Sequence, residues 1–201
     1  MAIRELIKEN KKPFFGYSDL TVILNAIYEK SNIPTYLYQI RNFVGDFSRI
    51  QIKNFKETFI NDCSEELIRF NYEWIQGNSM EGIIIGGNIR CFLKLAGTEY
   101  MPDFQDKILL LESMSGDAFK MNTYLNQYKQ LGILEKVKGI VLGNFAEMQN
   151  KNIEPDIISI LNSKMNEKQI PIIKTNDIGH NSDSKCVVLG RKLSVSTDDD
   201  Y

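Results

Sequence analysis

The chain has little of what metal-binding or disulfide-stabilised proteins need. His180 is the only histidine among 201 residues, and Cys63, Cys91 and Cys186 are widely spaced, without a C-x-x-C pair. One histidine and no cysteine pair argue against a zinc site, and an odd number of scattered cysteines argues against a disulfide framework. We expect reduced, mostly buried thiols in a cytoplasmic protein, with no metal and no cofactor.

The chain also lacks an excess of positive charge and any long apolar run. It carries 24 Lys and Arg against 26 Asp and Glu, a formal net charge of -2, which argues against nucleic acid as a partner. No stretch reaches the apolar length of a membrane span, and the N-terminus lacks the apolar core of a signal peptide. With 43% hydrophobic and 25% charged residues, the composition is that of a soluble globular protein with one large or two small domains.

The stretch around which the chain is organised is PFFGYSDLT at residues 13–21. A short aromatic strand reaches Gly16, Ser18 follows, and an amphipathic helix pattern begins at Leu20. Strand, tight turn, serine and helix is the arrangement that raises a nucleophilic hydroxyl at the positive end of a helix dipole. The alternative is an ordinary helix cap made by Ser18 or Asp19, since the second glycine of the G-x-S-x-G elbow is replaced by Leu20.

The first third of the chain contains one clear supersecondary unit. An apolar run at 33–38 predicts a second strand, which closes a right-handed β-α-β unit begun by the serine-bearing strand. Residues 41–51 have no clear period and are predicted to be a loop. Helical spacing over 53–70, with Ser64 as a helix cap, precedes turn residues at 77–79. We expect a domain boundary between about 60 and 80.

The remainder alternates strands and helices. Strands are expected at 82–88, 107–112, 137–143 and 170–173, and helices at 89–96, 118–131 and 155–165. The helix at 118–131 has a predicted core face, and Gly132 is expected to end it. That core face consists of Phe119, Met121, Leu125, Tyr128 and Leu131. Two strands are expected at 186–189 and 193–195, and Gly190 and Arg191 between them predict a hairpin. The acidic residues 198–200 are expected to be a solvated end of the chain.

Two polar residues stand out by their positions at the ends of elements. Glu112 ends an otherwise apolar strand, where a charge is costly unless it is paired. His180 lies in a glycine-flanked loop just after a predicted strand. Each has a plain alternative, a surface carboxylate at a strand end and a loop histidine. The order Ser18, Glu112, His180 is nevertheless the Ser, acid, His order of many α/β hydrolases.

The serine stretch also resembles a known motif. FFGYSDLT at 14–21 is similar to the nucleophile motif of the LD-carboxypeptidases and of the related microcin C immunity-type serine peptidases. The resemblance covers nearly the whole chain, in order, and several matched blocks are far more specific than the serine motif alone. These blocks are EGIIIGGNI at 81–89, GTEYMPDF at 97–104, ILLLE at 108–112, VKGIVLG at 137–143 and IGH at 178–180.

The resemblance implies a serine peptidase without a cofactor. Ser18 matches the family's nucleophile, Glu112 its acid and His180 its base, and the backbone N–H of Asp19 would be the first oxyanion donor. The glycine-rich turn of Gly86, Gly87 and Asn88 is the candidate for substrate binding. The substrates implied are murein tetrapeptides, cleaved at the amide bond to a terminal D-alanine, or a peptide-nucleotide antibiotic. Family relatives form homodimers, so a homodimer is expected.

The chain departs from the family pattern in two places. First, family members carry further β-α units and a glycine-rich loop before the serine motif, whereas about a dozen residues precede it here. Second, residues 113–117 lack the pattern of acidic residues that the family usually has directly after the position of Glu112. We therefore expect an α/β fold with a remnant of a parallel-sheet N-terminal domain over 1–60, a linker over 61–78 and a swivelling-type C-terminal α/β domain over 79–201. The alternative to an active peptidase is a truncated family member that folds or binds ligand without turnover.

Overall fold

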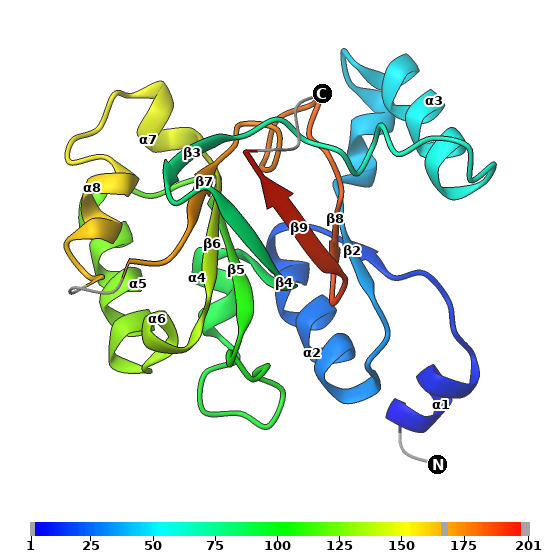
Figure 1. Cartoon of the computed structure of the whole chain (residues 1–201). Coiled ribbons are helices and arrows are strands. Elements are labelled where there is room, and N and C mark those ends of the chain that lie inside the picture. Colours follow the sequence, from blue (N-terminus) through cyan, green and yellow to red (C-terminus); the bar gives the residue numbers. More distant parts are fainter. Residues whose placement is uncertain (1–2, 166–168, 198–201) are drawn as a thin grey trace.

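The computed structural model describes residues 3–165 and 169–197 and has a mixed α/β fold with two sheets (Figure 1). The larger sheet has six strands in the order β3-β7-β6-β5-β4-β9, and the smaller has three in the order β1-β2-β8. The strands are β1 (Phe15–Gly16), β2 (Thr35–Leu37), β3 (Glu73–Gln76), β4 (Ser79–Asn88), β5 (Lys107–Ser113), β6 (Gly139–Phe145), β7 (Ile172–Lys174), β8 (Val187–Leu189) and β9 (Lys192–Ser196). The helices are α1 (Ile3–Glu9), α2 (Thr21–Ser31), α3 (Ser48–Phe59), α4 (Ile89–Leu93), α5 (Ala118–Gln130), α6 (Ile133–Lys136), α7 (Ala146–Asn150) and α8 (Ile157–Asn162), with 3-10 turns η1 (Ser18–Leu20) and η2 (Ile40–Val44).

The centre of the large sheet is parallel. Strands β4, β5, β6 and β7 run in the same direction, and β3 and β9 are antiparallel edge strands. Parallel strands covered on both faces read as continuous apolar runs, which is why the strands at 82–88 and 107–112 could be predicted. Along β5, Leu109 and Leu111 join the core that contains α5, whereas Ile108 and Leu110 join the core that contains Leu24 of α2.

The predicted β-α-β unit at the start of the chain is confirmed. β1 pairs in parallel with β2, with Phe15 opposite Tyr36 and Gly16 opposite Leu37, and α2 connects them. Helix α2 ends at Ser31, and the next residue, Asn32, adopts the left-handed conformation with a φ of +56° that commonly stops a helix. In Figure 1, α2 and the small sheet lie on the β9 side of the large sheet, away from α5–α8.

The predicted C-terminal hairpin is wrong. Strand β8 pairs with β2 in the small sheet, and β9 pairs with β4 in the large one. Gly190, with a φ of +82°, donates its N–H to the carbonyl of Ile84, so the chain crosses between the sheets at this turn. The residue pattern of two adjacent strands is the same whether they pair with each other or with other strands. Only the unoccupied edges of β2 and β4 decide the pairing.

Two local predictions between residues 41 and 70 are also wrong. The predicted loop contains η2, and helix α3 already begins at Ser48; it ends at Phe59 rather than continuing to residue 70. Ser64 lies in a turn, where its hydroxyl accepts the N–H of Glu66. The helix here is set by tertiary packing, because Phe55 and Phe59 join an aromatic cluster with Phe15 of β1.

The long helix α5 differs from its prediction on one face. Met121, Leu125 and Tyr128 are buried as expected, but Phe119 is 83% exposed and Leu131 is 41% exposed. Gly132 follows the helix with a φ of +67°, which confirms it as the terminating residue. The short elements β3, α6 and α7 have no prediction in the sequence analysis. The acidic end at 198–200 lies outside the described residues.

Candidate functional site

Ser18 lies on a strained turn between a strand and a helix. Its φ is +55°, in the left-handed region that residues other than glycine seldom adopt. The turn follows β1 directly and is closed by the N–H of Leu20, which donates to the carbonyl of Tyr17 at 3.0 Å. Neither η1 nor α2 has a side-chain cap, so the capping alternative for Ser18 and Asp19 is wrong. A strained, partly exposed serine at this point is typical of a nucleophile elbow.

The carboxylate of Asp19 ties the serine turn to α4. It accepts a hydrogen bond from the Cys91 thiol, with sulfur and oxygen 2.9 Å apart, and lies 2.9 Å from the Lys94 amine. The Arg90 guanidinium is 3.5 Å away. The hydrogen bonds from Cys91 and Lys94 lower the pKa of Asp19. Asp19 is thus anchored through its side chain, which holds its backbone next to Ser18.

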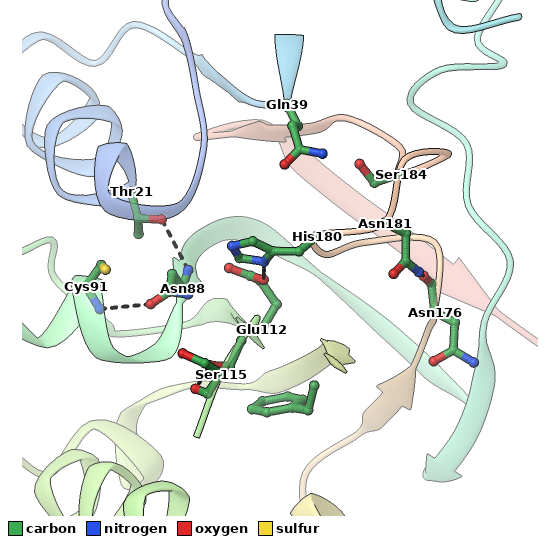
Figure 2. A network of polar contacts seen from close by, with 12 residues as sticks. Thr21, Gln39, Asn88, Cys91, Glu112, Ser115, Asn176, His180, Asn181 and Ser184 are labelled. Carbon is green, nitrogen blue, oxygen red and sulfur yellow. Dashed lines mark hydrogen bonds and ion pairs between the residues drawn. The ribbon is translucent and has the colours of Figure 1, made fainter. Parts of the chain in front are cut away.

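The glycine-rich turn at the end of β4 is bound to α2. The N–H and the carbonyl of Gly86 both bond the side-chain amide of Asn25, at 3.0 and 2.9 Å. The N–H of Asn88 donates to the Thr21 hydroxyl at 3.1 Å, and the Asn88 side chain caps α4 by accepting the N–H of Cys91 (Figure 2). A Cβ at Gly87 would lie 2.9 Å from the Thr21 hydroxyl, so only glycine fits there. Substrate binding by Gly86, Gly87 and Asn88 stays a prediction.

Glu112 and His180 form a buried pair. Glu112 lies near the end of β5 with 1% of its surface exposed, and its Oε2 is 2.8 Å from Nδ1 of His180, whose side chain is 6% exposed (Figure 2). The surface-carboxylate alternative for Glu112 is therefore wrong. A carboxylate can only accept, so Nδ1 carries the proton of this hydrogen bond. The neutral imidazole then has Nε2 free to act as a base.

The loop after β7 holds His180 in place. Asn144 at the end of β6 donates its N–H to the carbonyl of Ile178 at 2.7 Å, beside Gly179, which has no room for a side chain. Within the loop, the amide of Asn181 donates to the carbonyl of Asn176 at 3.2 Å. The backbone and side chains of this loop thus fix the direction of the imidazole.

Polar residues of the N-terminal part also hold this loop. Asn42 of η2 donates to the Ser184 hydroxyl at 3.1 Å and to the carbonyl of Asn181 at 3.3 Å. Gln39 in turn bonds Asn42, and Figure 2 shows Gln39 and Ser184 on the same side of His180. These residues could not be recognised from the sequence, because a buried amide or hydroxyl in a segment without a clear period has no sequence signal.

The serine turn and the buried pair meet at Tyr17. Its ring packs on the imidazole of His180, with 4.3 Å between ring centroids and 56° between the planes. Tyr17 directly precedes Ser18, so the structure places the residue next to the serine turn against the Glu112–His180 pair. That Ser18, Glu112 and His180 act as a triad stays a prediction. Over residues 3–165 and 169–197, no group of three or more His, Cys, Asp or Glu side chains could hold a metal ion. In the same ranges, no helix is long and apolar enough to cross a membrane.

Comparison with known families identifies the chain. The LD-carboxypeptidase C-terminal domain matches residues 81–195, and the LD-carboxypeptidase N-terminal domain matches residues 2–38. The chain belongs to the LD-carboxypeptidase family. This confirms the resemblance inferred from the motifs at 14–21, 81–89 and 108–112.

Curated relatives and solved structures support this assignment. The chain is 26% identical over 200 residues to a "Probable murein peptide carboxypeptidase" of Bacillus subtilis, covering 96% of this chain and 62% of that protein. It is 24% identical to the microcin C7 self-immunity protein MccF of Escherichia coli, covering 96% and 65%. A crystal structure of a MccF-like protein from Bacillus anthracis matches 98% of this chain and 68% of that chain, with a TM-score of 0.71 and 28% identity.

The extent of these matches is uneven. The chain spans 62–64% of the length of the first three curated relatives, while they cover 89–96% of it. The structure of wild-type MccF without ligand matches with a TM-score of 0.80 over 97% of this chain and 68% of that chain. At 23% identity, that match confirms the α/β fold and nothing further.

Proposed function

We propose that this chain is a serine peptidase of the LD-carboxypeptidase type, with Ser18 as nucleophile, His180 as base and Glu112 as acid. The observation that carries the proposal is the buried pair of Glu112 and His180, 2.8 Å apart, in contact with the residue that precedes a strained serine. Each member of a Ser-His-acid triad needs the environment found here: a partly exposed serine, an oriented imidazole and a buried carboxylate.

The geometry suggests the usual order of steps. Nε2 of His180 takes the proton of the Ser18 hydroxyl as the oxygen attacks an amide carbonyl, and Glu112 stabilises the imidazolium through Nδ1. The imidazolium then gives the proton to the leaving amine, which leaves an acyl-enzyme, and water activated by His180 releases the acyl group. The backbone N–H of Asp19 is the proposed first oxyanion donor, held in place by the contacts of its side chain with α4.

The substrate that we propose is a murein peptide, cleaved at the amide bond to its terminal D-amino acid. The relative from Bacillus subtilis named for this class of substrate supports the choice. A peptide-nucleotide conjugate is the second candidate, because MccF structures contain glutamyl sulfamoyl guanosine and aspartyl sulfamoyl adenosine. A cytoplasmic location, a homodimer and the division into residues 1–60, 61–78 and 79–201 belong to the same proposal.

Labelling by a fluorophosphonate probe tests the proposal. We expect the purified chain to be labelled on Ser18, and the Ser18→Ala variant not to be labelled. Ser163→Ala, which changes an exposed serine after α8, is the matched control and should be labelled like the wild type. Absence of labelling in a folded sample would contradict an activated nucleophile and favour a family member that binds ligand without turnover. Screening with murein tetrapeptides and aminoacyl-nucleotide analogues then separates the two substrate classes.

A further inference from the structure

Tyr17 has a position that the proposed mechanism does not use. It follows β1, precedes Ser18, and its ring packs on the imidazole of His180 at a centroid distance of 4.3 Å. A side chain from the serine turn thus covers one face of the proposed base. Any shift of Tyr17 would change the orientation of the imidazole relative to the serine hydroxyl.

Three buried side-chain atoms have no hydrogen-bond partner in the described part of the chain: the hydroxyl of Tyr17, Oδ1 of Asn144, and Oε1 of Glu112, the carboxylate oxygen that does not bond His180. Of the first two, the Tyr17 hydroxyl is the one that can donate to the carboxylate, because an amide oxygen only accepts. A buried polar atom without a partner is costly, and such atoms are rare in native proteins. The Tyr17 hydroxyl and Oε1 of Glu112 are complementary, because a phenol can donate and a carboxylate can only accept.

Charges from two other elements act on the Tyr17 hydroxyl. Burial raises the pKa of Tyr17 most, the negative charge of Glu112 raises it further, and the positive charge of Arg41 in η2 lowers it. Because the Tyr17 ring packs on the imidazole that Glu112 contacts, the side chains of Tyr17 and Glu112 lie around the same histidine. The Tyr17 hydroxyl keeps its proton at any physiological pH, so it can act as a donor throughout the working range.

We infer that Tyr17 is a positioning residue for the Glu112–His180 pair. Its ring supports the imidazole, and its hydroxyl donates to Oε1 of Glu112 through one water molecule. With this bond, the carboxylate is held at both oxygens, and its negative charge is shared between Tyr17 and His180. The role rests on the proposed function, since it serves the base that activates Ser18.

NMR titration of the imidazole is the experiment that tests this inference. His180 is the only histidine in the chain, so its ring signals need no assignment among several residues. In Tyr17→Phe, the carboxylate of Glu112 loses a donor and attracts the imidazolium more strongly. We therefore expect the imidazole signals of the variant to titrate at higher pH than those of the wild type. Tyr100→Phe, which changes an exposed tyrosine, should titrate like the wild type.

Urea unfolding is a second test, because the urea midpoint of Tyr17→Phe should shift in opposite directions with and without a hydrogen bond from Tyr17 to Glu112. If Tyr17 bonds Glu112, Tyr17→Phe leaves a buried carboxylate oxygen without a donor, and the urea midpoint falls. If the hydroxyl has no partner, its removal relieves a buried unsatisfied group, and the midpoint rises. A rise in the midpoint, or a His180 titration that overlays that of the wild type, would overturn the inference.

Neither reading depends on turnover, so the inference and the proposed function can fail separately. Ser18-dependent labelling together with an unchanged titration in Tyr17→Phe would overturn the inference alone. If the unaltered chain is folded but not labelled, while His180 of Tyr17→Phe titrates at higher pH than in the wild type, the proposed function alone would be overturned. If Tyr17→Phe does not fold, exchange of the Tyr17 hydroxyl proton in the unaltered chain decides: slow exchange is expected, and fast exchange contradicts a hydrogen bond.

Discussion

Replacing Glu112 by Gln changes one buried oxygen to nitrogen and tests the proposed base most directly. The carboxylate is 1% exposed and accepts the hydrogen of Nδ1 across 2.8 Å. Glutamine at this site can present its NH₂ group to the ring, and a donor at that position is satisfied only by an unprotonated Nδ1. The proton then moves to Nε2, and the imidazole can no longer accept the proton of Ser18.

The expected loss follows from this exchange of tautomers. A triad whose acid is replaced by its amide keeps its geometry and loses about 10⁴-fold in rate. We expect the second-order rate of fluorophosphonate labelling to fall by about 10³–10⁴-fold in Glu112→Gln. Folding should survive, because Gln has nearly the shape of Glu, can still bond the neutral imidazole, and leaves no buried charge without a partner.

The assay compares labelling rates measured by intact-protein mass. Glu81→Gln is the matched control, because Glu81 lies on the neighbouring strand β4, and its carboxylate bonds the exposed Lys192 at 2.9 Å. That variant should be labelled at the wild-type rate. A Glu112→Gln chain that is folded and labelled on Ser18 at close to the wild-type rate would refute the assignment of Glu112 as the acid.

Two further predictions concern stability. Asn25→Ala should lower the free energy of unfolding by about 2–4 kcal/mol in urea titrations, because it leaves the buried N–H and carbonyl of Gly86 without partners. Asn61→Ala, which changes an exposed asparagine, is the control. An equal, small effect in both variants would contradict the prediction. Burial lowers the pKa of Lys174 from 10.5 to about 8, so between these values the unfolded chain binds more protons and stability rises with pH. From pH 7.5 to 10 the wild type should gain about 2 kcal/mol relative to Lys174→Met. Relative to Lys53→Met, which changes an exposed lysine, the wild type should show no such gain. A difference in unfolding free energy between wild type and Lys174→Met that does not change with pH would contradict the lowered pKa of Lys174.

The alternation of elements could be predicted because it depends on local patterns. Continuous apolar runs at 82–88 and 107–112 indicate strands covered on both faces, and the aromatic run before Gly16 followed by a helical pattern indicates the β-α-β unit. Glu112 and His180 were recognisable because a charge at the end of an apolar strand and a lone histidine beside a glycine are unusual. Their contact is implied only by the family resemblance; no local pattern indicates it, since 68 residues separate them.

Other features depended on contacts between distant segments. The pairing of β8 with β2 and of β9 with β4 is determined by which sheet edges remain open, and the two strands would look the same in a hairpin. Helix α3 begins at Ser48 in a segment without a clear period, because its aromatic residues complete a cluster with β1. The exposure of Phe119 likewise reflects the absence of a neighbouring element over that face of α5 within the described residues.

The sequence by itself determined the family, the α/β class and the three residues proposed for catalysis, because motifs and hydrophobic periods are local properties of a chain. Only the tertiary structure decided that Glu112 is buried against His180, that Tyr17 packs on the imidazole, and that Asp19 is anchored to α4. These contacts join segments far apart in the chain. Their energies come from burial and from pairing polar groups away from water, and neither exists until the segments have packed together.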